Sequence, residues 1–336
     1  MLKFITIVLL FLSLLNASDK DEYSLGSGVQ IGSAPLYVGG YISTDYQYNS
    51  NDSQNQFRID DIAFLAYGSY EKVSYLAEIE FRDYYIYQWD SNGSDSVLND
   101  RLHIERLYLD YLVNDEFTFR VGKFNSPIGY WNLTPINVLR DTSSNPMLSY
   151  ILYPKFTTGV DLTYNYFGDY EFKLDLMLQR SEDIDGNYNN IDIDEHYGLG
   201  LEISKDDWSL KANGGYFHAL DKAYENQNFY YALVGGEYED DKYKFTAELA
   251  TQLSESKTTI DYITYFKALY KITDKQMPVM RIESYKSSLY NLSEDDTSLT
   301  IGYTYRPLFP VAIKGEYQFH TLDKYDKLYI SFSVMF

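Results

Sequence analysis

Apolar side chains recur at every second position in many short stretches of this chain. The clearest stretch is residues 328–336, in which the even positions are apolar and the last of them is Phe336. Because successive side chains of a β-strand point to opposite faces, such a stretch has one apolar face and one largely polar face. Apolar residues at helical spacing do not occur in the chain. The pattern therefore predicts an all-β fold.

About sixteen alternating stretches follow one another along the sequence. They cover 36–48, a stretch ending at 70, 73–82, 102–113, 117–123, 159–166, 170–179, 197–204, 208–217, 229–238, 243–253, 260–270, 277–285, 299–306, 311–319 and 328–336. Short polar connections between them, such as 71–72 and 114–116, indicate β-hairpins. Longer connections follow the odd-numbered stretches, notably 83–101, 125–157 and 180–196.

Such sorting of connections by length is typical of antiparallel barrels that cross a membrane, with short turns on one side and long loops on the other. A soluble β-sandwich gives no reason for it and would have to bury its aromatic faces against each other. We therefore predict a transmembrane antiparallel β-barrel of about 16 strands, with the apolar face toward lipid and the polar face toward the interior.

The N-terminus has the features of a secretory signal peptide. Lys3 precedes an apolar run, residues 4–15, and small residues at 16–18 offer a cleavage site. This run is too short for a transmembrane helix, which needs roughly 20 apolar residues. We expect residues 1–18 to be removed and residues 19–336 to form a single barrel domain.

Composition agrees with a barrel in a membrane. The chain has no cysteine, 37 tyrosines and 19 phenylalanines, and aromatic residues favour both strands and membrane–water interfaces. The mean hydropathy of −0.36 argues against a helical membrane protein, but a barrel needs apolar residues only at alternate positions. The formal net charge of −21 makes nucleic acid an unsuitable partner.

Taken together, these features resemble the bacterial outer-membrane porins. The stretch 120–132, Arg-Val-Gly-Lys-Phe-Asn-Ser-Pro-Ile-Gly-Tyr-Trp-Asn, resembles the strand end and loop entry of the phosphate-selective-porin-like group. The resemblance implies a channel for small hydrophilic solutes, usually a homotrimer, in an outer membrane with lipopolysaccharide. It also implies that the terminal Phe336 serves as a signal to the barrel assembly machinery. The basic clusters of a dedicated phosphate channel are not evident.

The third long connection, residues 125–157, is rich in apolar side chains, which would be a liability on an exposed loop. In porins of this architecture the corresponding loop folds into the barrel, and we expect the same here. Alternatively, the segment is a plug or a contact between protomers with no role in selectivity.

Charged side chains of both signs lie on the predicted inner face of nearly every strand. A water-filled lumen accepts them at little cost, whereas lipid would not. The predicted pore-lining residues are Glu78, Glu80, Asp110, Asp161, Lys173 and Asp175. The predicted constriction is formed by loop residues Arg140, Asp141 and Lys155 opposite Arg82, Arg106 and Arg120, where opposed charges would set ion preference. The three arginines could instead pair with Glu78, Glu80 or Asp110 and be purely structural.

Other functions have weaker support. His103, His196, His218 and His320 lie near predicted loop ends, without the motif of a catalytic nucleophile, and we interpret them as exposed rim residues. Residues 181–192 partly match a calcium-binding loop but lack its flanking helices, which leaves divalent-cation binding open. A surface adhesin, an outer-membrane enzyme and a solute-specific anion channel remain alternatives to the diffusion pore. No motif for a cofactor is visible, and we predict no enzymatic activity.

Overall fold

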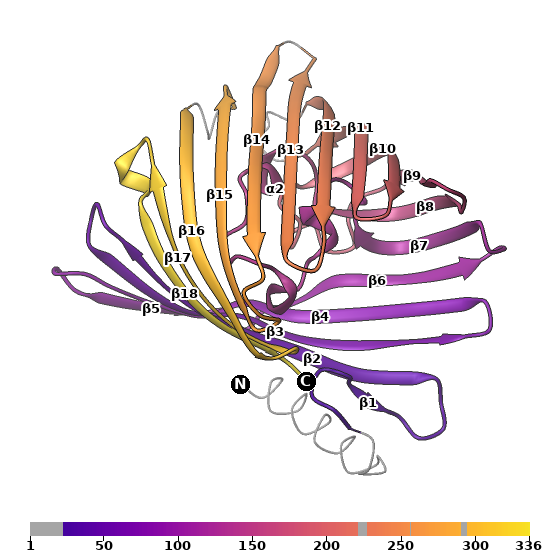
Figure 1. Ribbon diagram of the computed structural model, residues 1–336, viewed down its shortest axis with the longest axis horizontal. Helices are drawn as coiled ribbons and strands as arrows, with labels where there is room; N and C mark the ends of the chain where they lie inside the picture. Colours follow the sequence, from indigo (N-terminus) through magenta and orange to yellow (C-terminus); the bar gives the residue numbers. More distant parts are fainter. Residues whose placement is uncertain (1–22, 221–226, 256, 290–293) are drawn as a thin grey trace.

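The computed structural model describes residues 23–220, 227–255, 257–289 and 294–336. The predicted signal peptide, residues 1–18, lies outside the described residues. Sixteen antiparallel strands form a closed barrel, in which each strand pairs with its neighbours in sequence and β18 pairs with β2. Figure 1 shows the closure where the first strands, in indigo, lie beside the last ones, in yellow. The described residues contain no helix with the length and apolar character needed to cross a membrane.

The barrel strands agree closely with the predicted stretches. They are β2 (Leu36–Asn49), β3 (Gln54–Tyr70), β4 (Val73–Trp89), β6 (Leu102–Leu112), β7 (Phe117–Asn125), β8 (Phe156–Tyr166), β9 (Glu171–Arg180), β10 (Ile193–Lys205), β11 (Trp208–Ala219), β12 (Asn228–Glu239), β13 (Tyr243–Ser254), β14 (Thr258–Tyr270), β15 (Gln276–Ser287), β16 (Asp295–Leu308), β17 (Val311–His320) and β18 (Lys327–Met335). The smaller elements are β1 (Val29–Gln30), β5 (Ser94–Leu98), α2 (Leu148–Ile151) and the 3-10 turns η1 (Trp131–Leu133), η2 (Asn137–Leu139) and η4 (Asp323–Tyr325).

The largest departure from the prediction is the second long connection. The sequence suggested a loop over 83–101, but β4 continues to Trp89 and pairs there with β5. The alternation is interrupted at Asp83, whose φ of +47° is left-handed, and the register between β3 and β4 shifts at the same level. A bulge of this kind breaks the period of two, so the strand beyond it was not recognised.

The predicted alternation between two faces is clear in the structure. On β13, Leu249 is 50% exposed whereas its neighbour Glu248 is 1% exposed. Apolar side chains cover the outside of most strands and polar ones point inward, which is the reverse of a soluble barrel. Within the described residues each barrel strand pairs with a strand on both sides, so the ladder closes on itself, as a lipid environment requires.

The C-terminal residue takes part in the closure of the barrel. The backbone N–H of Phe336 donates to Gly40 O, and Gly40 N–H donates to Phe336 O, both at 2.9 Å. A Cβ on Gly40 would come within 2.8 Å of the Phe336 ring, so this glycine makes room for the terminal aromatic side chain. The end of the chain is therefore fixed against the first barrel strand.

A charge placed on the outer face tests whether this face meets lipid. Leu249 lies in the middle of β13, whereas Leu210 lies near the turn that precedes β11, and both are exposed. We expect Leu249→Arg to lower the free energy of unfolding in lipid vesicles by ~2–4 kcal/mol and Leu210→Arg by ~0–1 kcal/mol. Denaturant titration followed by tryptophan fluorescence measures both. Equal, small losses would contradict a lipid-facing surface.

Candidate functional site

The connection between β7 and β8, residues 126–155, is tied to charged side chains on the last strands of the barrel. Buried backbone N–H and C=O groups need hydrogen-bond partners, and few are available within an irregular loop. Glu316 of β17 accepts hydrogen bonds from the backbone N–H groups of Ser143 (3.0 Å) and Ser144 (2.8 Å). Arg281 of β15 is 0% exposed and donates to Ser144 O at 2.9 Å and to the Thr142 hydroxyl at 3.0 Å. The wall thus supplies the partners that the loop lacks.

Lysines of the wall hold two further positions of the loop. Lys314 Nζ lies 2.8 Å from the side-chain oxygen of Asn137, and Lys267 Nζ lies 2.5 Å from Asp141 Oδ2. Both lysines are buried, so each ammonium depends on these oxygens for its hydrogen bonds.

The start of the loop needs a glycine. Gly129 has a φ of +65°, and a Cβ there would collide with the carboxylate of Glu248. Its N–H donates to Asn213 Oδ1 at 3.0 Å, and the next N–H, of Tyr130, donates to Glu248 Oε1 at 2.6 Å. Two successive N–H groups are therefore fixed by two different strands, β11 and β13.

A cavity of about 500 Å³ lies between this loop, the first barrel strands (β2, β3, β4 and β6) and the last ones (β15–β18). Its lining carries more acidic than basic side chains. The acidic residues are Asp45, Asp60, Asp61, Glu80, Asp83, Glu105, Glu283 and Asp296. The basic residues are Arg58, Arg82, Arg140, Lys155 and Lys327. Opposite charges therefore face the same water-accessible space.

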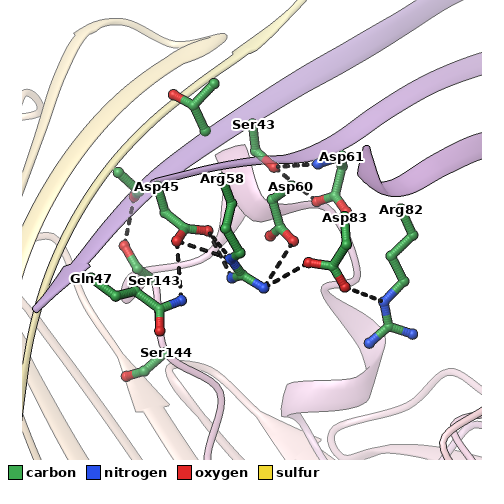
Figure 2. A network of polar contacts seen from close by, with 12 residues as sticks. Ser43, Asp45, Gln47, Arg58, Asp60, Asp61, Arg82, Asp83, Ser143 and Ser144 are labelled. Carbon is green, nitrogen blue, oxygen red and sulfur yellow. Dashed lines mark hydrogen bonds and ion pairs between the residues drawn. The ribbon is translucent and has the colours of Figure 1, made fainter. Parts of the chain in front are cut away.

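Arg58 is the centre of an ionic network on the wall of this cavity (Figure 2). Its guanidinium lies 2.7 Å from Asp45, 2.8 Å from Asp83 and 3.5 Å from Asp60. The network ends at Arg82, whose Nε is 4.0 Å from Asp83 Oδ2 and whose side chain is 44% exposed. Arg58 thus faces three carboxylates, whereas Arg82, at the end of the network, is more accessible to solutes.

Irregular pairing creates this concentration of charge. The β3–β4 register shifts between Ile59 and Asp61, so Asp60 and Asp61 both line the cavity although they are consecutive. In a regular strand one of them would point outward, where a carboxylate in lipid is unfavourable.

The six predicted constriction residues do not form one cluster. Arg82, Arg140 and Lys155 line the 500 Å³ cavity. Arg106 and Arg120 instead line a second cavity of about 380 Å³, and Asp141 pairs with Lys267.

The two displaced arginines are held by carboxylates on neighbouring strands. Arg106 Nε donates to Glu78 Oε2, and Arg120 binds both oxygens of Asp110, at 2.6 and 2.8 Å. This is the structural pairing that the sequence left open, and it explains why these side chains stay near their own strands.

Of the six predicted pore-lining residues, Asp110 is held in the ion pair with Arg120, and the other five fall into two groups. Asp161, Lys173 and Asp175 line the second cavity. Glu78 and Glu80, in contrast, are 0% and 1% exposed and lie beside Glu105, another buried carboxylate.

The expectation of four exposed rim histidines is wrong. His103 and His196 are 6% and 0% exposed, and the latter lies 3.0 Å from the hydroxyls of both Thr157 and Tyr231. His218 and His320 pair with aspartates at 2.6 Å. Contacts with residues distant in sequence bury His103 and His196 and leave His218 and His320 half-buried, which strand alternation does not reveal.

The acidic connection before β10 is partly buried, and two of its carboxylates have basic partners. Asp183 pairs with buried Lys123 at 2.8 Å, and Asp185 lies 3.0 Å from His103 Nδ1. The carboxylates that suggested a calcium loop are thus partnered by basic side chains.

Sequence reasoning missed several charged residues of the 500 Å³ cavity. They include Asp45, Arg58, Asp60, Asp61 and Glu105. The adjacent acidic pair at 60–61 was an available signal, because two consecutive charges within a strand that faces lipid on one side require a bulge.

Comparisons with known proteins identify a matching family model and solved structures of similar fold. The family model of phosphate-selective porin O and P matches residues 37–212, more than half of the chain. OmpT of Vibrio cholerae is similar in structure, with a TM-score of 0.60 at 13% identity over 91% of this chain and 99% of that chain. OmpF of Salmonella typhi has a TM-score of 0.58 at 14% identity, over 90% of this chain and 97% of that chain. A mutant of the porin of Rh. blastica has a TM-score of 0.55 at 15% identity, over 90% of this chain and 100% of that chain. These structural likenesses concern the fold. No curated protein sequence matches the chain.

The anchoring of the loop by Arg281 can be tested with a matched pair of substitutions on β15. Arg281→Met removes several hydrogen bonds to buried groups of the loop, and we expect it to lower the free energy of unfolding by ~3 kcal/mol. Lys286→Met removes only an exposed ion pair to Asp261, and we expect a loss below ~1 kcal/mol. Limited proteolysis should cut within residues 126–155 only in Arg281→Met. Similar stability and cleavage of both variants would show that Arg281 does not anchor the loop.

Proposed function

The chain belongs to the phosphate-selective porin O and P family and forms an outer-membrane channel for passive solute diffusion; we propose that residues 126–155 enter this channel and narrow it. The observation that carries the proposal is the set of hydrogen bonds from this segment to inward side chains such as Glu316 and Arg281. A loop held in this way lies across the path of solutes, and the 500 Å³ cavity beside it is the space left for them.

We propose that the opposed charges of this cavity determine which ions pass. Charges of both signs at a narrow point create a transverse field and change the local concentration of counter-ions. Because the lining has eight carboxylates against five basic side chains, we expect a moderate preference for cations. The phosphate preference in the family's name requires a basic excess, which this lining does not have.

Several further properties belong to the same proposal. Residues 1–18 direct export, Phe336 marks the chain for the barrel assembly machinery, and the mature barrel forms a homotrimer surrounded by lipopolysaccharide. Support comes from the apolar N-terminal run, the terminal aromatic residue and the porin fold. A channel rather than an enzyme is the function that the porin family and fold favour.

The contribution of Arg82 to selectivity can be separated from that of a paired arginine. Arg82 lines the main cavity with an accessible guanidinium, whereas Arg120 is bound by Asp110. In planar bilayers under a salt gradient, Arg82→Gln should shift the reversal potential toward greater cation preference, and Arg120→Gln should shift it less. A larger shift with Arg120→Gln would place the selective region at the second cavity.

Selectivity should also depend on pH through Lys155. Burial, with Arg140 and Arg82 nearby, lowers the pKa of Lys155 to about 7. The side chain is therefore neutral above this pKa and gains a positive charge as the pH falls, so cation preference should decrease between pH 8 and pH 6. His320 lines the same cavity, so the change must be compared with that of Lys155→Met. An identical pH dependence in the variant would show that Lys155 is not responsible.

A further inference from the structure

We propose that Glu78, Glu80 and Glu105 bind one hard divalent cation, such as Ca²⁺, in the barrel wall between β4 and β6. Each residue offers one carboxylate oxygen, and these three oxygens lie within 4.8 Å of one another. Calcium binds oxygen ligands at about 2.3–2.6 Å. Three oxygens at most 4.8 Å apart lie within about 2.8 Å of a common centre, so a small closing movement of the carboxylates lets one ion contact all three. The exposed fractions are 0%, 1% and 4%, so bulk solvent screens these charges little.

An unpartnered oxygen lies at this cluster. Glu78 Oε2 accepts a hydrogen bond from Arg106, but Glu78 Oε1 is buried and has no hydrogen-bond partner in the described part of the chain. A buried carboxylate oxygen without a partner is unfavourable, and a bound cation would satisfy it.

The backbone is arranged so that the third carboxylate joins the other two. Between β4 and β6 the register shifts at Glu78 and Ile79, and Glu105 is the extra residue on β6 between Ile104 and Arg106. Regular alternation would place Glu105 and Arg106 on opposite faces, whereas the bulge lets both point inward.

The hydrogen-bond donors around the cluster do not balance its charge. The hydroxyl of Tyr41 lies 3.0 Å from Glu80 Oε2 and 3.1 Å from Glu105 Oε2, but its single proton can serve only one of them fully. Tyr188 donates to the other oxygen of Glu80. Among the described residues, Arg106 is the cation that forms an ion pair within this cluster, and its partner is Glu78. When all three carboxylates are ionised, two negative charges are left for one divalent ion.

A cation can reach the cluster from water. Glu80 and Glu105 line the 500 Å³ cavity, whereas Glu78 lies behind them and lines none of the described cavities. Water from the cavity would complete the coordination, because calcium takes six to eight oxygen ligands.

Binding of calcium itself is the first test, on the full chain refolded in detergent. Isothermal titration with CaCl₂ should show one saturable site, and Ca²⁺ should raise the unfolding temperature. Glu105→Gln should weaken the affinity by about tenfold or more and abolish the rise. Glu237→Gln on β12, which removes another inward carboxylate, should leave both unchanged. Tb³⁺ luminescence sensitised by tyrosine gives an independent readout, because Tyr41 and Tyr188 contact the ligands.

Two outcomes would overturn the proposal. Either no saturable Ca²⁺ binding occurs, or Glu105→Gln binds Ca²⁺ as the unmodified chain does. A shared proton between Glu80 and Glu105 would produce the first outcome together with greater stability at lower pH. Glu105→Gln relieves repulsion, so it is expected to fold without Ca²⁺, and the heat-dependent gel shift of folded barrels verifies this.

A channel measurement tests the calcium site and the proposed pore separately. An effect of bound Ca²⁺ on ion preference rests on the proposed function, whereas Ca²⁺ binding itself does not. If the pore proposal holds, Ca²⁺ at the cluster neutralises carboxylates of the cavity lining and lowers cation preference in the reversal potential, and Glu105→Gln removes this effect. If Ca²⁺ binds without any change in selectivity, the calcium site is supported, but the proposal that the 500 Å³ cavity determines ion preference is contradicted.

Discussion

The architecture depends on the hydrogen bonding of an irregular segment by buried charges. Residues 126–155 form no sheet of their own, so their N–H and C=O groups need partners from elsewhere. Glu316, Arg281 and Lys314 supply them, and all three are nearly inaccessible to water. Because an unpaired buried charge is strongly unfavourable, loop and wall stabilise each other. Some inward charges that the sequence pattern would assign to the pore lining therefore hold the 126–155 segment against the barrel wall.

β-Bulges have a comparable influence at the opposite wall. The shifts near Asp61 and Glu78 interrupt the two-residue period on neighbouring strands. Each shift turns an additional carboxylate inward without moving a charge into lipid. The result is a local excess of acid in a barrel whose remaining wall charges are largely paired. The ionic network of Arg58 and the cluster of Glu78, Glu80 and Glu105 are both products of this irregularity.

The chain also illustrates how pairing changes the meaning of a charged residue. Arg82 and Arg120 are equivalent in the sequence pattern, since both lie on inward positions of early strands. Arg120 is bound by Asp110 in a bidentate pair, whereas Arg82 lies at the end of a network and remains accessible. A strong fixed pair presents little net field to a passing ion, while an accessible guanidinium beside a cavity presents much of its charge.

Sequence alone determined the strands, their number and which face meets lipid. These features follow from local chemistry: a strand alternates its side chains, and lipid accepts only apolar ones over a closed ladder. The 328–336 stretch and the short turns were readable for this reason. Tertiary structure decided the extension of β4, the burial of His196, the separation of Arg82 from Arg106, and the gathering of Glu105 with its neighbours. Each of these depends on register shifts or on contacts between residues far apart in the chain, such as Arg281 with Ser144, and neither leaves a period in the sequence.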